Sequence, residues 1–333
     1  MKVTTQISRW IYLTIATMFV LSIAVSANPD VIEKSFTVKE GGWLKVESDV
    51  GSIDVDARSG DKVDVKVIRE IDSRREEKVK RFLENLQVEI TQSGNDVIVT
   101  AEYKERWNRR SWDYDNVRVE FLITVPRKFN VDLMTAGGSI AVGDLEGQVQ
   151  VETAGGSLRF GSITGEVHGR TAGGSITLES CNGEVDVRTS GGSIKIGDVD
   201  GNVKALTSGG SIKVAQAKGD VLAETSGGSI KVEEVMGNIE ASTSGGSIKA
   251  SITQQPKGDC RLETSGGSVT VELARDIAVD INAKSSWGRI SSDFKIDGWD
   301  EEEDESYARG TINGGGPKLY LRTSAGKVRI RKM

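Results

Sequence analysis

Hydrophobic and polar residues follow a fixed period through the middle of the chain. Within this period the triplet Gly-Gly-Ser recurs every 18 residues, beginning at Gly137, Gly155, Gly173, Gly191, Gly209, Gly227 and Gly245. An eighth copy begins at Gly266 after a spacing of 21 residues, and degenerate copies surround Gly51, Gly288 and Gly326. A short fixed period is typical of a solenoid, in which each repeat is one turn of the backbone and packs only on its neighbours.

Aligning the copies places hydrophobic residues in columns, with polar residues between them. One such column contains Ile140, Leu158, Ile176, Ile194, Ile212, Ile230, Ile248 and Val269. Alternation with a period of two predicts strands with one buried face, and the many β-branched residues favour strands over helices. Each coil is therefore predicted to hold two short strands, such as 194–196 and 203–207, with glycines at the turns supplying a positive φ.

These features predict an all-β fold, a single-chain parallel β-solenoid with 18-residue coils at a spacing of ~4.8 Å. Right-handed winding is favoured by the crossover preference. A threonine column from Thr135 to Thr264 is in phase with the inward residues, so we interpret it as a hydrogen-bonded ladder at a corner and not as an ice-binding surface. Calcium-binding β-rolls and hexapeptide helices do not fit, because their own repeat patterns are missing from the coils.

The two ends of the solenoid are less regular. Alternating runs predict strands at 35–46, 51–57, 62–71, 87–91, 96–103 and 116–125. Residues 73–86 predict one helix, capped by Asp72 or Ser73, with an apolar face of Val79, Phe82, Leu83 and Leu86. We expect 28–135 to form a β-rich N-terminal cap, 136–272 the regular coils, and 273–333 irregular final coils with a C-terminal cap.

Residues 1–27 have the pattern of a signal peptide. Lys2 and Arg9 precede an apolar run over 11–25, which is shorter than the ~20 residues that a membrane span needs. Small residues end at Ala27, so we expect cleavage before Asn28, with no integral membrane span afterwards. The protein would then be exported and periplasmic, or secreted to the cell surface; the alternative is an uncleaved anchor.

Composition narrows the function classes. The chain carries 43 basic and 49 acidic residues, a net charge of −6, which argues against a nucleic-acid partner. A single histidine argues against a His-ligated metal site or a His-dependent triad, and we predict no cofactor and no metal. Cys181 and Cys260 occupy hydrophobic columns four coils apart, so both are predicted to be buried and unpaired.

Two groups of residues are candidates for binding a ligand. The candidate ligand-binding patch consists of Tyr103, Arg106, Trp107, Arg109, Arg110, Trp112 and Tyr114. Aromatic residues and arginine are enriched in binding hot spots, although the same aromatics could instead pack over the cap. A possible basic stripe consists of Lys195, Lys213, Lys231 and Lys249. Stacked ~4.8 Å apart, these lysines could bind an anionic polymer, but neighbouring acids such as Glu233 dilute the charge.

Signals for catalysis are weak. A serine two residues before each lysine of the stripe suggests a Ser–Lys nucleophile, but the pair occurs in four coils, whereas catalysis needs one tuned site. Asp198 and Asp200 flank a turn, but Gln216 and Lys218 are their stacked neighbours, so no acidic cluster forms there. The sequence therefore predicts no catalytic residues.

The chain resembles the bacterial envelope family of β-strand-repeat proteins labelled "putative adhesin", a domain of unknown function. The resemblance covers about residues 31–333 and rests on four segments: Gly41–Val46, Asp49–Ile53, Val125–Pro126 and the Thr-Ser-Gly-Gly-Ser-Ile coils. It implies a secreted or periplasmic β-solenoid without defined catalytic residues.

From these observations we expect a non-enzymatic, exported cell-envelope protein with a binding, adhesin-like or scaffold role. Its partner would be an envelope protein, a surface glycan or a peptide ligand. The alternative is an enzyme, a lyase or glycosidase, that acts on an envelope polysaccharide; acids clustered across adjacent coils would favour it.

Overall fold

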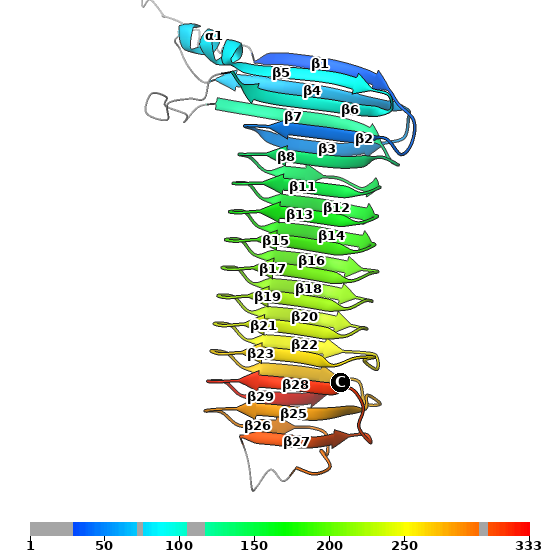
Figure 1. Ribbon diagram of the computed structural model, residues 1–333, viewed down its shortest axis with the longest axis vertical. Coiled ribbons are helices and arrows are strands. Elements are labelled where there is room, and N and C mark those ends of the chain that lie inside the picture. The colour runs from blue at the N-terminus through cyan, green and yellow to red at the C-terminus, as the bar shows by residue number, and fades with distance from the viewer. Residues whose placement is uncertain (1–28, 72–75, 105–116, 300–305) are drawn as a thin grey trace, which may run out of the picture.

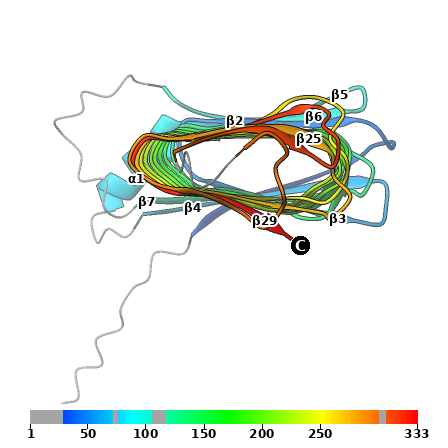
Figure 2. The same cartoon turned by 90° about the horizontal axis from the view of Figure 1, so that it is seen from below.

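The computed structural model describes residues 29–71, 76–104, 117–299 and 306–333, which form a long rod of stacked β-strands (Figure 1). Seen from its end, the rod is a flattened coil whose two long sides are β-sheets facing one another (Figure 2). Within the described residues the first sheet has 15 strands and the second has 14. The predicted all-β solenoid is confirmed.

Each regular coil contributes one strand to each sheet. In the coil that opens at Gly191, β16 (Ile194–Val199) belongs to the first sheet and β17 (Val203–Thr207) to the second. Ile194 pairs in parallel with Ile176 and Ile212, which lie 18 residues away on either side, so the register is the one the columns predict. The aligned hydrophobic columns fill the space between the sheets.

The other regular strands follow the same scheme. In the first sheet they are β9 (Ile140–Val142), β10 (Leu145–Glu146), β12 (Leu158–Thr164), β14 (Ile176–Asn182), β18 (Ile212–Ala217), β20 (Ile230–Val235), β22 (Ile248–Ile252) and β24 (Val269–Leu273). In the second sheet they are β8 (Asn130–Thr135), β11 (Val149–Thr153), β13 (Val167–Thr171), β15 (Val185–Thr189), β19 (Val221–Thr225), β21 (Ile239–Thr243) and β23 (Cys260–Thr264).

The Gly-Gly corners are built for close approach between coils. A Cβ atom on Gly210 would stand 2.1 Å from the carbonyl oxygen of Gly192 in the preceding coil, and Gly192 has the same relation to Gly174. Among the paired glycines of the repeats only Gly138 has a positive φ, of 127°. The expectation of a positive φ was therefore wrong for the Gly-Gly pairs apart from Gly138, because the neighbouring backbone is what excludes a side chain there. At the other turn of the coil, Gly165 and Gly183 do have positive φ values, of 144° and 156°.

The threonine column forms the predicted hydrogen-bonded ladder. The hydroxyl of Thr207 donates to the carbonyl of Gly192 in the preceding coil at 2.8 Å and accepts from the amide of Gly210 in its own coil at 3.4 Å. On the solvent side of the threonine ladder, the amide of Ser211 donates to the hydroxyl of Ser193 in the preceding coil at 3.2 Å. These bonds recur in the regular coils and satisfy polar groups of the corner that would otherwise be buried without partners.

The N-terminal region continues both sheets. β2 (Trp43–Ser48) and β3 (Ser52–Arg58) form a degenerate coil that pairs in parallel with β8 and β9. Beyond this coil lie β6 (Asp96–Tyr103) and β7 (Val117–Pro126), and the sheets end in antiparallel strands: β4 (Lys62–Ile71) and β1 (Asp30–Thr37) in the first sheet, and β5 (Leu86–Ser93) in the second. The strand predicted over 35–46 is in fact two strands, because the chain turns at 38–42, where Gly41 has a φ of 81°.

The predicted helix is present as α1 (Glu76–Asn85) and lies at this end of the rod (Figure 1). Phe82 is buried, and Val79 and Leu83 pack against the core, as the apolar face predicted. Leu86 is also buried but begins β5. The predicted cap residues, Asp72 and Ser73, lie outside the described residues.

The C-terminal coils are stacked out of sequence order. The last coil, β28 (Lys318–Thr323) and β29 (Val328–Lys332), lies between the coil of β23 and β24 and the coil of β25 (Val279–Ser285) and β26 (Ile290–Ser292). β27 (Tyr307–Ile312) then pairs antiparallel with β25 at the end of the second sheet. In Figure 1 the red strands β28 and β29 accordingly lie between yellow and orange ones. The coil around Trp287 is therefore near the end of the rod.

Both cysteines are buried and form no disulfide, as predicted. Four pairing steps lead from β14, which holds Cys181, to β22, the strand before Cys260, so about 19 Å separates the two coils along the axis. Burial raises the pKa of the Cys181 thiol to about 11, and burial also raises the pKa of Cys260. Among the described helical residues there is no apolar helix long enough to cross a membrane.

Candidate functional site

The candidate ligand-binding patch is described only at its base. Tyr103 ends β6, packs partly buried against the core, and donates its amide to the carboxylate of Asp49 at 2.9 Å. The other six residues, Arg106, Trp107, Arg109, Arg110, Trp112 and Tyr114, lie outside the described residues. The patch therefore stays a prediction.

The described chain before and after these residues lies near the helix. The amide of Lys104 donates to the carbonyl of Asn85 at the end of α1, at 3.0 Å, and the chain re-enters the first sheet at Val117. The two described residues that flank the rest of the patch, Lys104 and Val117, thus lie at the helical end of the rod.

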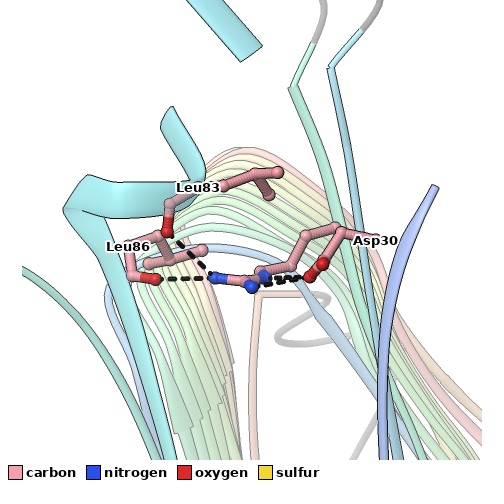
Figure 3. Close-up of polar contacts among 4 residues, drawn as sticks. Asp30, Leu83 and Leu86 are labelled. Atoms are coloured by element: carbon pink, nitrogen blue, oxygen red, sulfur yellow. Dashed lines mark hydrogen bonds and ion pairs between the residues drawn. The ribbon is translucent and has the colours of Figure 1, made fainter. Parts of the chain in front are cut away.

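A largely buried arginine holds this end of the rod together (Figure 3). Arg69 on β4 donates twice to Asp30 on β1, at 2.6 and 2.9 Å, and also to the carbonyls of Leu83 and Leu86, at 3.2 and 2.8 Å. Its side chain is 11% exposed. Because a helix leaves its last carbonyls without intrahelical partners, Arg69 both satisfies these groups and ties α1 to the two outermost strands of the first sheet.

The basic stripe is stacked as predicted but is largely neutralised. Lys213 and Lys231 both contact Glu233, at 3.1 and 2.6 Å, and Lys249 contacts Glu272 at 2.7 Å. The hydrogen bonds from Lys231 and then Lys213 lower the pKa of Glu233. Lys195 alone of the four has no ion pair within the described residues. The predicted dilution by Glu233 is confirmed, which weakens the stripe as a site for an anionic polymer.

A group of carboxylates near the cap was not predicted from the sequence. Asp54 and Asp56 on β3 line a hollow on the first sheet together with Asp64 on β4, and Glu120 on β7 lies close enough to act on Asp54. Burial, then the charge of Asp56, raises the pKa of Asp54, while Arg159 acts in the opposite sense. These acids come from strands far apart in the sequence, so only their pairing brings them together. At the predicted turn, in contrast, Asp200 is paired with Lys218 and no cluster forms.

A second missed feature is an exposed group at the other end of the rod. Trp287 replaces the first glycine of a corner and is 87% exposed. On the adjoining second sheet, Lys284 lies between Arg322 and Tyr307, and Asn282 lies between Tyr320 and Arg309. We call Trp287, Lys284, Tyr307, Arg309 and Arg322 the C-terminal surface. The signal in the sequence was a tryptophan at a corner position that holds glycine in the regular coils.

A shallow hollow leads along the second sheet toward this surface. It has a volume of about 580 Å³ and lies between one outward row of side chains, which includes Glu224, Ser242 and Glu263, and the serines of the corners. Arg322 and Ser324 line it at the C-terminal end. The hollow is polar, which suits a hydroxyl-rich ligand better than an apolar one. In the part of the chain that the structure describes, no three acidic, histidine or cysteine residues are placed to hold a metal ion.

The fold places this protein in the class of parallel β-solenoids, with consecutive coils joined by the hydrogen-bonded threonine ladder at their corners. Residues 43–331 match the profile of the family described as Toastrack DUF4097, so the chain belongs to that family. No curated protein matches the sequence.

Several solved structures match this chain at low sequence identity and low TM-score. A "putative adhesin" from Bacteroides fragilis is 12% identical, covering 91% of this chain and 97% of that one, with a TM-score of 0.34. A "putative cell adhesion protein" from Clostridium sporogenes is 13% identical, covering 91% and 100%, with a TM-score of 0.21. A "putative adhesin" from Parabacteroides distasonis is 11% identical, covering 92% and 98%, with a TM-score of 0.32. At these scores the similarity carries no argument about function.

Proposed function

We propose that this protein is a non-enzymatic, adhesin-like binding protein or scaffold of the cell envelope. The observation that carries the proposal is the distribution of polar groups over the rod. In the regular coils the corner hydroxyls are hydrogen-bonded, and three of the four stacked lysines are ion-paired. Exposed aromatic residues occur instead at the C-terminal end, where the directly paired Arg322 and Lys284 form no ion pair within the described residues. Their support is rigid because consecutive coils are hydrogen-bonded.

Export is part of the same proposal and rests on residues 1–27. The short apolar run and the small residues that end at Ala27 support cleavage before Asn28. N-terminal sequencing of the protein purified from its native envelope is expected to begin at Asn28. Recovery of the chain with Met1 in a membrane fraction would contradict the proposal of a cleaved signal.

The partner is expected to bind through Trp107 and Trp112 of the candidate ligand-binding patch. The purified protein would be used to capture an envelope protein, surface glycan or peptide from an extract of the native envelope. Replacing Trp107 and Trp112 with alanine should abolish capture and leave the β-rich circular dichroism unchanged, because aromatic residues supply much of the energy in hot spots. Met134→Ala, which removes an exposed apolar side chain of β8 from outside both candidate surfaces, is the matched control. Undiminished capture by the double variant would show that the predicted patch does not bind the partner.

The second candidate function is cleavage of an envelope polysaccharide. The observation in its favour is the raised pKa of Asp54 beside Asp56, since a glycosidase needs one carboxyl group that keeps its proton and one that does not. Asp54→Asn and Asp56→Asn would each abolish the release of new sugar ends from purified envelope polysaccharide. If the unaltered protein releases none, this candidate is wrong.

A further inference from the structure

The C-terminal surface concentrates positive charge that no ion pair with another described residue neutralises. Arg322 and Lys284 are directly paired residues of β28 and β25, and Arg309 pairs with Asn282 on the next strand. Within the described residues none of these three cations forms an ion pair. Adjacent like charges on one face of a sheet destabilise it, so this arrangement costs free energy unless an anion binds there.

The acid beside Arg322 on the neighbouring strand is already engaged. Glu263 is the neighbour of Arg322 on β23, but it accepts a hydrogen bond from Arg261 at 2.9 Å. Arg261 in turn lies over the ring of Tyr320, 4.9 Å from the ring centre. Arg261 and Glu263 therefore satisfy each other, and the guanidinium of Arg322 remains available for an external carboxylate.

The aromatic residues of the surface indicate what else the ligand must offer. Trp287 is 87% exposed and is fixed by its backbone, because its amide donates to the carbonyl of Ser324 at 3.0 Å. Tyr307 is 37% exposed and lies opposite Lys284. An indole ring this exposed costs hydrophobic free energy in water, and it provides a flat apolar platform for a sugar ring.

We propose that the C-terminal surface binds a linear polysaccharide whose sugar rings carry carboxylate groups. Arg322, Lys284 and Arg309 bind the carboxylates, and arginine does so with the paired geometry of its guanidinium. Trp287 stacks on a sugar ring, and the polar hollow that begins at Arg322 receives hydroxyl groups of the adjoining sugars. An acidic peptide is less well matched, because the exposed indole of Trp287 offers a flat platform of the kind on which a sugar ring stacks. This inference rests on the proposed binding function and names a ligand class for it.

The test is binding of defined oligosaccharides to the purified chain. Oligogalacturonate is the probe and its methyl-esterified form, which lacks the charge, is the neutral comparison; affinity is measured by calorimetry at low salt and at raised salt. Oligogalacturonate should bind and weaken with salt, whereas the ester should bind at least about tenfold more weakly. No binding of oligogalacturonate, or equal binding of both forms, would overturn the proposal.

Variants locate the site and separate the ligand class from simple charge attraction. Arg322→Gln with Lys284→Gln, and separately Trp287→Ala, should each weaken binding at least about tenfold. Lys195→Gln is the matched control, because it removes an exposed lysine without an ion pair from the other sheet, and it should leave the affinity unchanged. If polyglutamate binds as tightly and Trp287→Ala has no effect, the ligand is an acidic peptide and the proposal is wrong. Capture of envelope partners through Trp107 and Trp112 is measured separately, so either result can fail alone.

Discussion

Replacing one glycine of a Gly-Gly corner tests how the coils are held together. Gly209 and Gly210 are adjacent, and neither has a positive φ. A Cβ on Gly210 would lie 2.1 Å from the carbonyl oxygen of Gly192, far inside any real contact, and both groups belong to the backbone. A Cβ on Gly209 would lie 3.1 Å from the carbonyl oxygen of Gly191, which a shift of a few tenths of an ångström relieves. Gly210→Ala should therefore open the corner, whereas Gly209→Ala should not.

The magnitude follows from the hydrogen bonds that join the two coils at this corner. They are Thr207 to Gly192 at 2.8 Å, Ser211 to Ser193 at 3.2 Å, Gly209 to Ser190 at 3.0 Å and Ile194 to Ser211 at 2.9 Å. At about 1 kcal/mol net for each bond, opening the corner costs about 4 kcal/mol. Alanine restricts the unfolded chain and returns about 0.4–1 kcal/mol, so Gly210→Ala should lose about 3 kcal/mol. In Gly209→Ala the corner stays closed, so the small cost of shifting the backbone nearly cancels the gain from restricting the unfolded chain.

Amide hydrogen exchange followed by mass spectrometry measures this effect where it occurs. In a solenoid each coil contacts only its neighbours, so the loss of protection in Gly210→Ala should centre on residues 190–212 and fade over adjacent coils. Gly209→Ala is the matched control and should exchange like the unaltered protein. If both variants lose protection equally, or if neither does, the close approach of the backbones is not the reason that Gly210 must be glycine.

Three further predictions follow from particular contacts. Arg69→Met should lower the free energy of unfolding of the helical end by about 3 kcal/mol, because it breaks a largely buried ion pair and leaves two carbonyls without a donor. The loss should appear as faster amide exchange in α1 and β5, and unchanged exchange there would refute the role of Arg69. Thiol titration without reductant should find two free thiols per chain that react only after denaturation, because Cys181 and Cys260 are buried and burial raises their pKa values. A disulfide between Cys181 and Cys260 would contradict the coil register. The hydrogen bond from Lys249 lowers the pKa of Glu272, so the stabilisation by this carboxylate is present above its unfolded pKa of about 4.3 and is lost as the pH falls through its lower folded pKa. The difference in unfolding free energy between the unaltered protein and Glu272→Gln should accordingly shrink on acidification, and a difference that grows would show that the sign is wrong.

The sequence alone determined the regular part of the fold. The 18-residue period, the alternation within it and the β-branched columns fix which residues face inward, and the ladder from Ile176 through Ile194 to Ile212 has that register. They also placed the threonine ladder and the two buried cysteines. This was possible because each coil packs only on neighbouring coils with the same residue pattern, so the pattern within one repeat also specifies the contacts between repeats. The same pattern did not give the reason for the glycines, because the distance from Gly210 to Gly192 depends on how closely two coils stack.

Only the tertiary structure decided the order of the coils at the two ends and, with it, the candidate surfaces. The insertion of β28 and β29 between earlier coils brings Arg322 beside Lys284 and exposes Trp287 near the end of the rod. Arg69 likewise reaches Asp30 and the end of α1 only after the outer strands have paired. Hydrophobic periodicity specifies which face of a strand is buried but not which strand lies beside it once the copies differ. The side chains that could bind a ligand come from such strands, so their grouping depends on the fold.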